Sequence, residues 1–118
     1  MATCCDQYRP YLGQMIKIII DRSIGAVHPK HPGLIYPINY GYLPNTVAPD
    51  GEEIDAYVLG VTLPLKEFTG TCIAFIHRQN DAEDKLILAP AGLSFSDSEI
   101  IKAINFQEQY YQSVIQRK

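Results

Sequence analysis

The first 90 residues carry the hydrophobic and polar pattern of several short β-strands. Residues 15–20 form a β-branched apolar run, too short for a stable helix, that predicts a strand closed by Asp21-Arg22-Ser23. Three further apolar runs predict strands as well, at residues 54–61, 70–76 and 85–89. Turn sequences separate the runs, namely Pro44-Asn45, Pro49-Asp50-Gly51 and an acidic connector over residues 78–84 that suits a hairpin loop.

Residues 24–37 have a different pattern, with three prolines and two glycines. Proline lacks a backbone N–H and restricts the residue before it. We therefore expect loops and edge strands in this segment, without long regular elements.

The last quarter of the chain predicts a helix. Ser96 followed three residues later by Glu99 is a capping-box signature. Apolar residues then recur at helical spacing, at Ile100, Ile104, Tyr111 and Val114 or Ile115, so we expect the helix to run to Lys118 and end the chain. Four or five short strands with a single late helix, without alternating β and α units, favour a mainly β (α+β) fold: a small twisted sheet or barrel carrying a helix.

Length, composition and charge exclude several classes of protein. We treat residues 1–118 as one domain. With 47% hydrophobic and 19% charged residues the chain is too apolar for a disordered regulator, and no run approaches the roughly 18 to 20 apolar residues of a membrane span. A net charge of −3 without a basic run argues against nucleic acid as a partner. Three cysteines cannot all pair within the chain, which favours a reducing cytoplasm.

Four carboxylates fall within six residues at Asp50-Gly-Glu-Glu-Ile-Asp55. Two carboxylates roughly 4 Å apart repel by about 4 kcal/mol at an effective dielectric of 20, so a convergent cluster needs a proton, a basic partner or a cation. On spacing alone, an ordinary turn with solvated Glu52 and Glu53 is favoured over metal binding. Asp55 fits that explanation poorly because it lies in an otherwise apolar strand run, where a charge needs a polar partner.

A second acidic group, Asp81, Glu83 and Asp84, occupies the predicted hairpin loop before Lys85. Such loops are usually solvated. If this loop folds beside the Asp50 turn, the two groups bring oxygens onto one or more Mg²⁺ ions, which favour carboxylates, waters and substrate phosphates.

Tyrosines and basic residues supply candidate phosphate donors. Tyr36, Tyr40 and Tyr42 alternate along the chain, and their hydroxyls either complete a packed core or donate to an anionic oxygen. Basic residues that are candidate charge-assisted donors are Lys17, Lys30, Arg78 and Lys85, although for each taken alone a surface charge is the favoured interpretation.

The motifs Tyr36-Pro-Ile-Asn-Tyr-Gly-Tyr42, Asp50-Gly-Glu-Glu-Ile-Asp55 and Lys85-Leu-Ile-Leu-Ala-Pro90 resemble, in order and spacing, the soluble family I inorganic pyrophosphatases, over about residues 15–111. There a Tyr-Pro-x-Asn-Tyr-Gly-Tyr segment precedes an Asp-Gly-Asp-Pro-x-Asp metal motif, and an Asp-x-Lys leads into a strand ending in Pro. The resemblance implies a five-stranded, OB-like barrel that hydrolyses pyrophosphate to two phosphates with Mg²⁺, or with Mn²⁺ in its place.

The resemblance also implies residue roles. Glu52 stands where the family has an aspartate that helps activate the attacking water, and it forms the catalytic pair with Asp55. The implied metal ligands are Asp50, Asp55, Asp81, Glu83 and Asp84. The implied substrate-binding residues are Lys17, Lys30, Tyr36, Tyr40, Lys85 and Tyr110.

The chain departs from the family pattern at several positions. Glu53 replaces the motif proline, Ile19 a metal-site glutamate, and Tyr111 a phosphate-binding lysine, while Arg78 falls near a further metal aspartate. No arginine stands directly upstream of Tyr36, where His28 or Lys30 is the substitute. These departures keep two alternatives open: hydrolysis of another phosphoanhydride, and a noncatalytic phosphate- or nucleotide-binding module. A small barrel also leaves apolar surface uncovered, which is compatible with a homo-oligomer.

Overall fold

The computed structural model describes residues 7–48, 51–79 and 83–117. The elements follow one another as a 3₁₀ turn η2 (Arg9–Tyr11), strands β1 (Met15–Arg22), β2 (Asn39–Leu43), β3 (Ile54–Val58), β4 (Glu67–Arg78) and β5 (Lys85–Ala89), helix α1 (Asp97–Glu108) and strand β6 (Ser113–Gln116). No helix of these ranges is long and apolar enough to cross a membrane.

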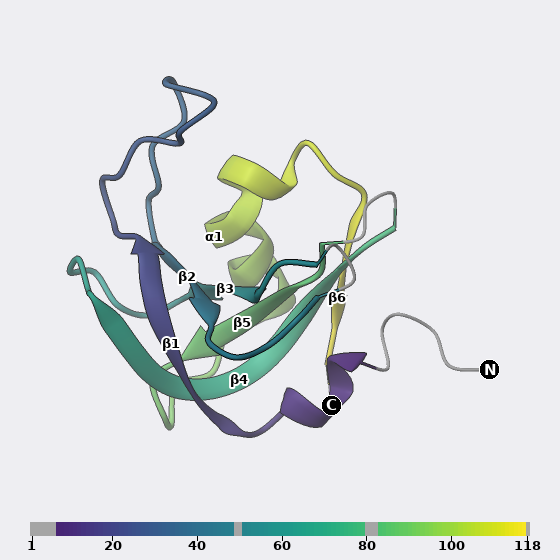
Figure 1. Cartoon of the computed structure of the whole chain (residues 1–118). Coiled ribbons are helices and arrows are strands. Elements are labelled where there is room, and N and C mark those ends of the chain that lie inside the picture. The colour runs from purple at the N-terminus through teal and green to yellow at the C-terminus, as the bar shows by residue number, and fades with distance from the viewer. Residues whose placement is uncertain (1–6, 49–50, 80–82, 118) are drawn as a thin grey trace.

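Five strands close into a barrel in the order β1-β2-β3-β5-β4, with β4 pairing back onto β1 (Figure 1). The pairs are antiparallel except for β3 and β5, which run parallel. The first part of the long strand β4 pairs with β1, and its last four residues pair with β6 outside the barrel. The expected five-stranded barrel with a late helix is confirmed.

The expectation that the helix continues to Lys118 is wrong, because α1 ends at Glu108 and β6 follows. The capping box at its start is present: the Glu99 backbone N–H donates to Ser96 Oγ over 3.1 Å, and the Ser96 N–H to Glu99 Oε1 over 2.8 Å. Beyond Gln109 the chain turns, and its backbone groups pair with the end of β4. The β-branched side chains of Val114 and Ile115, assigned to a helical face by their spacing, suit the strand they form.

Strand limits also differ from the sequence pattern. The first strand continues to Arg22, the strand expected over residues 54–61 stops at Val58, and the one expected over 70–76 extends in both directions. Strand β2, within the tyrosine motif, was not predicted. Gly41 explains its close pairing with β1, because a Cβ at this position would overlap the carbonyl oxygen of Ile19. The segment 24–37 is mostly loop, as expected, with one isolated bridge between Val27 and Ile35.

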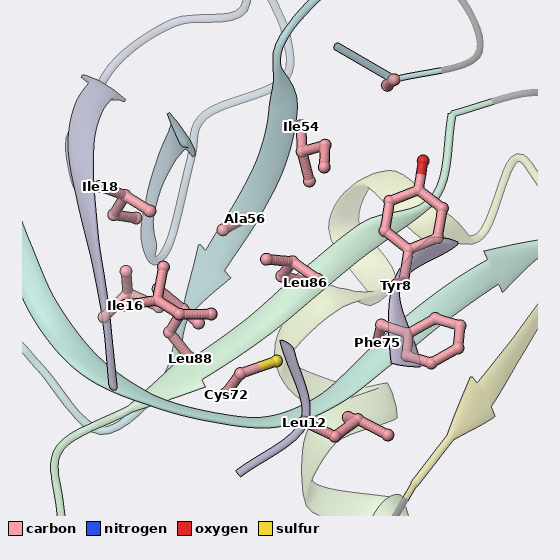
Figure 2. Packing of buried hydrophobic residues seen from close by; sticks show 12 residues of the cluster. Tyr8, Leu12, Ile16, Ile18, Ile54, Ala56, Cys72, Phe75, Leu86 and Leu88 are labelled. Atoms are coloured by element: carbon pink, nitrogen blue, oxygen red, sulfur yellow. The ribbon is translucent and has the colours of Figure 1, made fainter. Parts of the chain in front are cut away.

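Two buried clusters result from the alternation of side chains along the strands. One fills the barrel with Ile16, Ile18, Ile54, Ala56, Val58, Cys72, Phe75, Leu86 and Leu88, and the N-terminal residues Tyr8 and Leu12 complete it (Figure 2). The other joins the outer face of the barrel to α1 and includes Tyr36, Tyr40, Tyr57, Ile87, Ile100 and Ile104. Asp55 and Tyr57 share one face of β3, so the polar residues described next lie on the outer face, beside α1.

Candidate active site

A polar cavity of about 690 Å³ opens beside the C-terminal end of α1. Its walls come from the end of β1, the loop that follows it, strands β2 to β5 and the residues after the helix. In Figure 1 that loop projects from the barrel on the side that carries α1. The volume lies within the roughly 300 to 1,000 Å³ of small-molecule sites.

Lys85, Tyr40 and Asp55 form a closed hydrogen-bonded triangle in this cavity. Lys85 Nζ donates to Tyr40 Oη and to Asp55 Oδ2, each over 2.7 Å, and Tyr40 Oη donates to Asp55 Oδ2 over 2.8 Å. The parallel register that places Asp55 opposite Lys85 brings the two charges together. Burial, and then the Asp55 charge, hold the pKa of Tyr40 well above its ordinary value, so its hydroxyl stays protonated. Because the Lys85 side chain is only 2% exposed and its ammonium group is hydrogen-bonded to both partners, this cation is held in one position.

Arg78 and Glu108 form a buried, bidentate ion pair at another part of the cavity. Arg78 Nε donates to Glu108 Oε1 over 3.0 Å and Nη2 to Oε2 over 2.5 Å, with side-chain exposures of 1% and 4%. Glu83 lies 3.5 Å from Nη1, and the guanidinium carbon lies 3.7 Å from the ring centre of Tyr111. Burial opposes the charge of Glu108, but its hydrogen bonds to Arg78 prevail and lower its pKa.

A line of hydrogen bonds, buried except at its arginine end, connects this pair to a second arginine. Arg22 Nη1 donates to Tyr36 Oη over 2.7 Å, and Tyr36 Oη donates to Gln107 Oε1 over 2.9 Å. Gln107 Nε2 donates to Tyr57 Oη over 2.8 Å, and Tyr57 Oη donates to Glu108 Oε2 over 2.5 Å. Every hydroxyl along the line accepts one hydrogen bond and donates one, so the order of donors and acceptors is consistent from end to end.

The structure brings together many of the residues implied by the resemblance. Seven of them line the cavity: Lys30, Tyr40, Glu52, Asp55, Glu83, Lys85 and Tyr110. Glu53, which replaces the motif proline, lines it as well. Asp50 and Asp81 lie outside the described residues.

Three implied site residues do not line the cavity. Lys17 is exposed on β1 and pairs with Glu67 over 3.6 Å. Tyr36 is fully buried behind Arg22. Asp84 is buried too, and its carboxylate accepts from the Arg78 backbone N–H over 3.0 Å and lies 2.9 Å from Nδ1 of His77.

Sequence reasoning missed Arg22, Tyr57, Gln107 and Glu108. One signal for the last two was available, because Gln107 and Glu108 follow Ile100 and Ile104 at helical spacing and therefore share the buried face of α1. A polar pair on a buried helix face predicts buried hydrogen-bond partners. Tyr57 gave a similar signal by alternating with Asp55 along β3.

The carboxylates of the cavity have the chemistry that Mg²⁺ requires. Glu52 and Glu53 are exposed at the rim, whereas Asp55 and Glu83 contact Lys85. Within the three described ranges no three His, Cys, Asp or Glu side chains converge as a metal cage. Mg²⁺ usually keeps several waters and binds through one or two carboxylates together with substrate phosphates. The donor set therefore fits an ion held jointly by the rim and a phosphate ligand.

Comparisons with known proteins agree on one family. The sequence model described as inorganic pyrophosphatase matches residues 10–116. The inorganic pyrophosphatase of Xylella fastidiosa is 29% identical over 106 residues, covering 81% of this chain and 58% of that protein. The Caulobacter vibrioides enzyme is 39% identical over 56 residues, covering 45% of this chain and 32% of that protein. The chain thus spans between a third and three-fifths of the length of these relatives.

The fold has relatives among solved structures. The crystal structure of inorganic pyrophosphatase from Ehrlichia chaffeensis superposes with a TM-score of 0.68 at 17% sequence identity. The superposition covers 90% of this chain and 87% of that one. At this identity the likeness establishes the barrel architecture.

Proposed function

Because this chain belongs to the inorganic pyrophosphatase family, we propose that it hydrolyses pyrophosphate to two phosphates with the assistance of Mg²⁺. The observation that carries the proposal is the Lys85 ammonium group, fixed between Tyr40 and Asp55 in a polar cavity. A buried, oriented cation in a polar cavity suits a phosphoryl oxygen whose negative charge increases during the reaction.

The chemistry follows from where charge develops. A water oxygen bonds to one phosphorus, the bridging P–O bond breaks, and the second phosphate leaves as an anion. Lys85, which the oxygens of Tyr40 and Asp55 hold in place, donates its remaining ammonium hydrogen to a phosphoryl oxygen, while Glu52 at the exposed rim accepts the proton of the water. Bound Mg²⁺ supplies charge neutralisation and a more acidic water. Glu52, Asp55 and Glu83 are the described residues that would hold it.

Lys30 and Tyr110 serve as outer contacts to the substrate. Both line the cavity, and Tyr110 is 70% exposed. Asp50 and Asp81 are assigned to the metal because of the resemblance. For Lys17, Tyr36 and Asp84 the present positions support roles outside the cavity.

The test is phosphate release from pyrophosphate in the presence of Mg²⁺, Mn²⁺ or a chelator. We expect metal-dependent release that the Asp55→Asn variant loses while retaining the wild-type circular dichroism spectrum, since asparagine preserves the shape but removes the charge held by Lys85. Glu67→Gln is the matched control, because it removes an exposed carboxylate outside the cavity. Full activity in Asp55→Asn would defeat the assignment.

The cavity volume supports a second candidate, a larger phosphoanhydride substrate. A panel of nucleoside diphosphates, nucleoside triphosphates and short polyphosphates separates the two. Calorimetric binding of pyrophosphate without phosphate release would identify a noncatalytic binding module instead.

The cellular setting is part of the proposal. We place residues 1–118 in a reducing cytoplasm as one domain, with pyrophosphate and no nucleic acid as partner; the free, buried thiol of Cys72 is compatible with this compartment. Exposed apolar side chains such as Ile35 and Leu63 support a homo-oligomer, which sedimentation analysis tests.

A further inference from the structure

Arg22, the last residue of β1, has no close carboxylate partner among the described residues. Its Nη1 donates to the neutral phenol of Tyr36. The carboxylate within ion-pair distance is that of Asp21, 4.0 Å from Nε and 55% exposed. By contrast, the two buried cations of the cavity, Arg78 and Lys85, have carboxylate oxygens at 2.5 Å and 2.7 Å. The positive charge of Arg22 is therefore the least compensated of the three.

The Arg22 side chain is positioned by a buried tyrosine, Tyr36. Tyr36 is fully buried, and its hydroxyl is fixed by Gln107 at the end of α1. The guanidinium carbon lies 5.6 Å from the ring centre of Tyr36 and 5.9 Å from that of Tyr40. A guanidinium has five N–H donors in a rigid planar fork. One bond to a phenol orients the fork and leaves donors for an anion that enters the cavity.

Lys30 adds a further positive charge to the lining of the cavity. Lys30, His28 and His31 come from the loop after β1 and line the same cavity as Arg22. Burial lowers the pKa of His28, and the charges of Arg22, His31 and Lys30 lower it further. The same cavity is lined by Glu52, Glu53 and Asp55. The cavity thus has basic groups for an anion and carboxylates for a metal cation.

We propose that Arg22 is an anion-binding arm of this cavity, which binds the phosphoryl group of a phosphoanhydride that lies away from Lys85. Both cations border one ring: Arg22 Cζ lies 5.9 Å and Lys85 Nζ 5.3 Å from the centre of Tyr40. A diphosphate that contacts both cations must therefore lie beside Tyr40. Tyr36 and Gln107 are positioning residues that act through Arg22. The identity of the ligand rests on the proposed function, whereas the anion site rests on the charge and geometry of Arg22.

The experiment measures binding of methylenediphosphonate, a diphosphate that cannot be hydrolysed at its bridge, by calorimetry with Mg²⁺ and with chelator. Charge-assisted hydrogen bonds of this kind correspond to about 10-fold to 100-fold in affinity, and we expect a loss of that size for Arg22→Gln. Arg22→Lys keeps the charge but loses the fork, so its loss should be smaller. Tyr36→Phe should also weaken binding by less than Arg22→Gln.

Lys102→Gln is the matched control, because it removes one positive charge from the exposed side of α1 without touching the cavity. Wild-type affinity in both Arg22 variants, or a loss no larger than that of Lys102→Gln, would overturn the proposal, as would absence of binding to the wild-type protein in both conditions. Binding that depends on Arg22 in a protein that does not hydrolyse pyrophosphate would retain the anion site and reject the proposed function. Pyrophosphatase activity with unchanged kcat/KM in Arg22→Gln would do the reverse.

Discussion

Replacing Arg78 by methionine removes one partner of the most deeply buried ion pair described in this fold. The change keeps an unbranched side chain of similar length but leaves the Glu108 carboxylate, 4% exposed, without its cation. Breaking a buried pair in this way costs about 3 to 5 kcal/mol. The lost contact with Glu83, which is 37% exposed and 3.5 Å away, adds less than about 1 kcal/mol. A domain is typically stable by about 5 to 15 kcal/mol, so the expected loss is a large fraction of the total.

Urea unfolding followed by far-ultraviolet circular dichroism measures this loss, and it suits a chain without tryptophan. With a slope of about 1 to 3 kcal/mol per molar urea, the midpoint should fall by about 1 M or more. The double variant Arg78→Met with Glu108→Gln should be less destabilised than the two single changes added together, because it leaves no unpaired charge.

The matched control is Arg117→Met, which breaks an arginine–aspartate contact of 2.8 Å at the surface, where the side chains of Arg117 and Asp97 are 36% and 63% exposed. Its cost should stay below about 1 kcal/mol. If Arg78→Met lowers the free energy of unfolding by no more than this control does, burial does not increase the contribution of the Arg78–Glu108 pair to stability, and the reasoning is refuted.

Three further predictions concern the fold. Gly41→Ala should prevent native β1–β2 pairing, because the added Cβ overlaps the Ile19 carbonyl oxygen; a native-like thermal transition would contradict this. Ser96→Ala should cost about 1 kcal/mol by removing the cap of α1, measurable in the same urea experiment, and a change of several kcal/mol would point to another role. The lowered pKa of Glu108 stabilises the fold above the roughly 4.3 of an unfolded glutamate, and this stabilisation disappears as the pH falls through the folded value. Unfolding free energy should therefore decrease in acid, and less steeply in Glu108→Gln.

The elements predicted from sequence are those whose signals are local. The strand at residues 85–89 and the capping box at Ser96 depend on neighbouring residues alone, and both were located correctly. Strand β2 depends on a distant contact, since Gly41 is needed only because Ile19 of another strand lies against it. The helix was extended too far because the apolar spacing to Ile115 fits a helix as well as the short strand that pairs with β4.

The residues of the site also divide into those with a local sequence signal and those that depend on distant contacts. The tyrosine, carboxylate and lysine motifs indicated Tyr40, Asp55 and Lys85, and the strand register brings them together. Asp84 sits one residue from Lys85, and because side chains alternate along an extended chain it points to the other side, toward His77. No motif indicated Arg22. Its proposed role as a hydrogen-bond donor to an anion depends on a phenol fourteen residues away and on the lack of a close carboxylate among the described residues.

The hydrogen-bonded line through Tyr36, Gln107 and Tyr57 predicts that anion binding and stability are coupled in this molecule. Gln107 and Glu108 are consecutive residues of α1. Gln107 holds Arg22 through the hydroxyl of Tyr36. Glu108 accepts hydrogen bonds from Tyr57 and directly from Arg78. Both tyrosines also pack in the cluster between the barrel and the helix. The orientation of the Arg22 side chain is therefore set by packed core residues rather than by the exposed loop beside it. A helix that shifts against the barrel disturbs both arginines together, so the last turn of α1 serves the cavity as much as it serves the core.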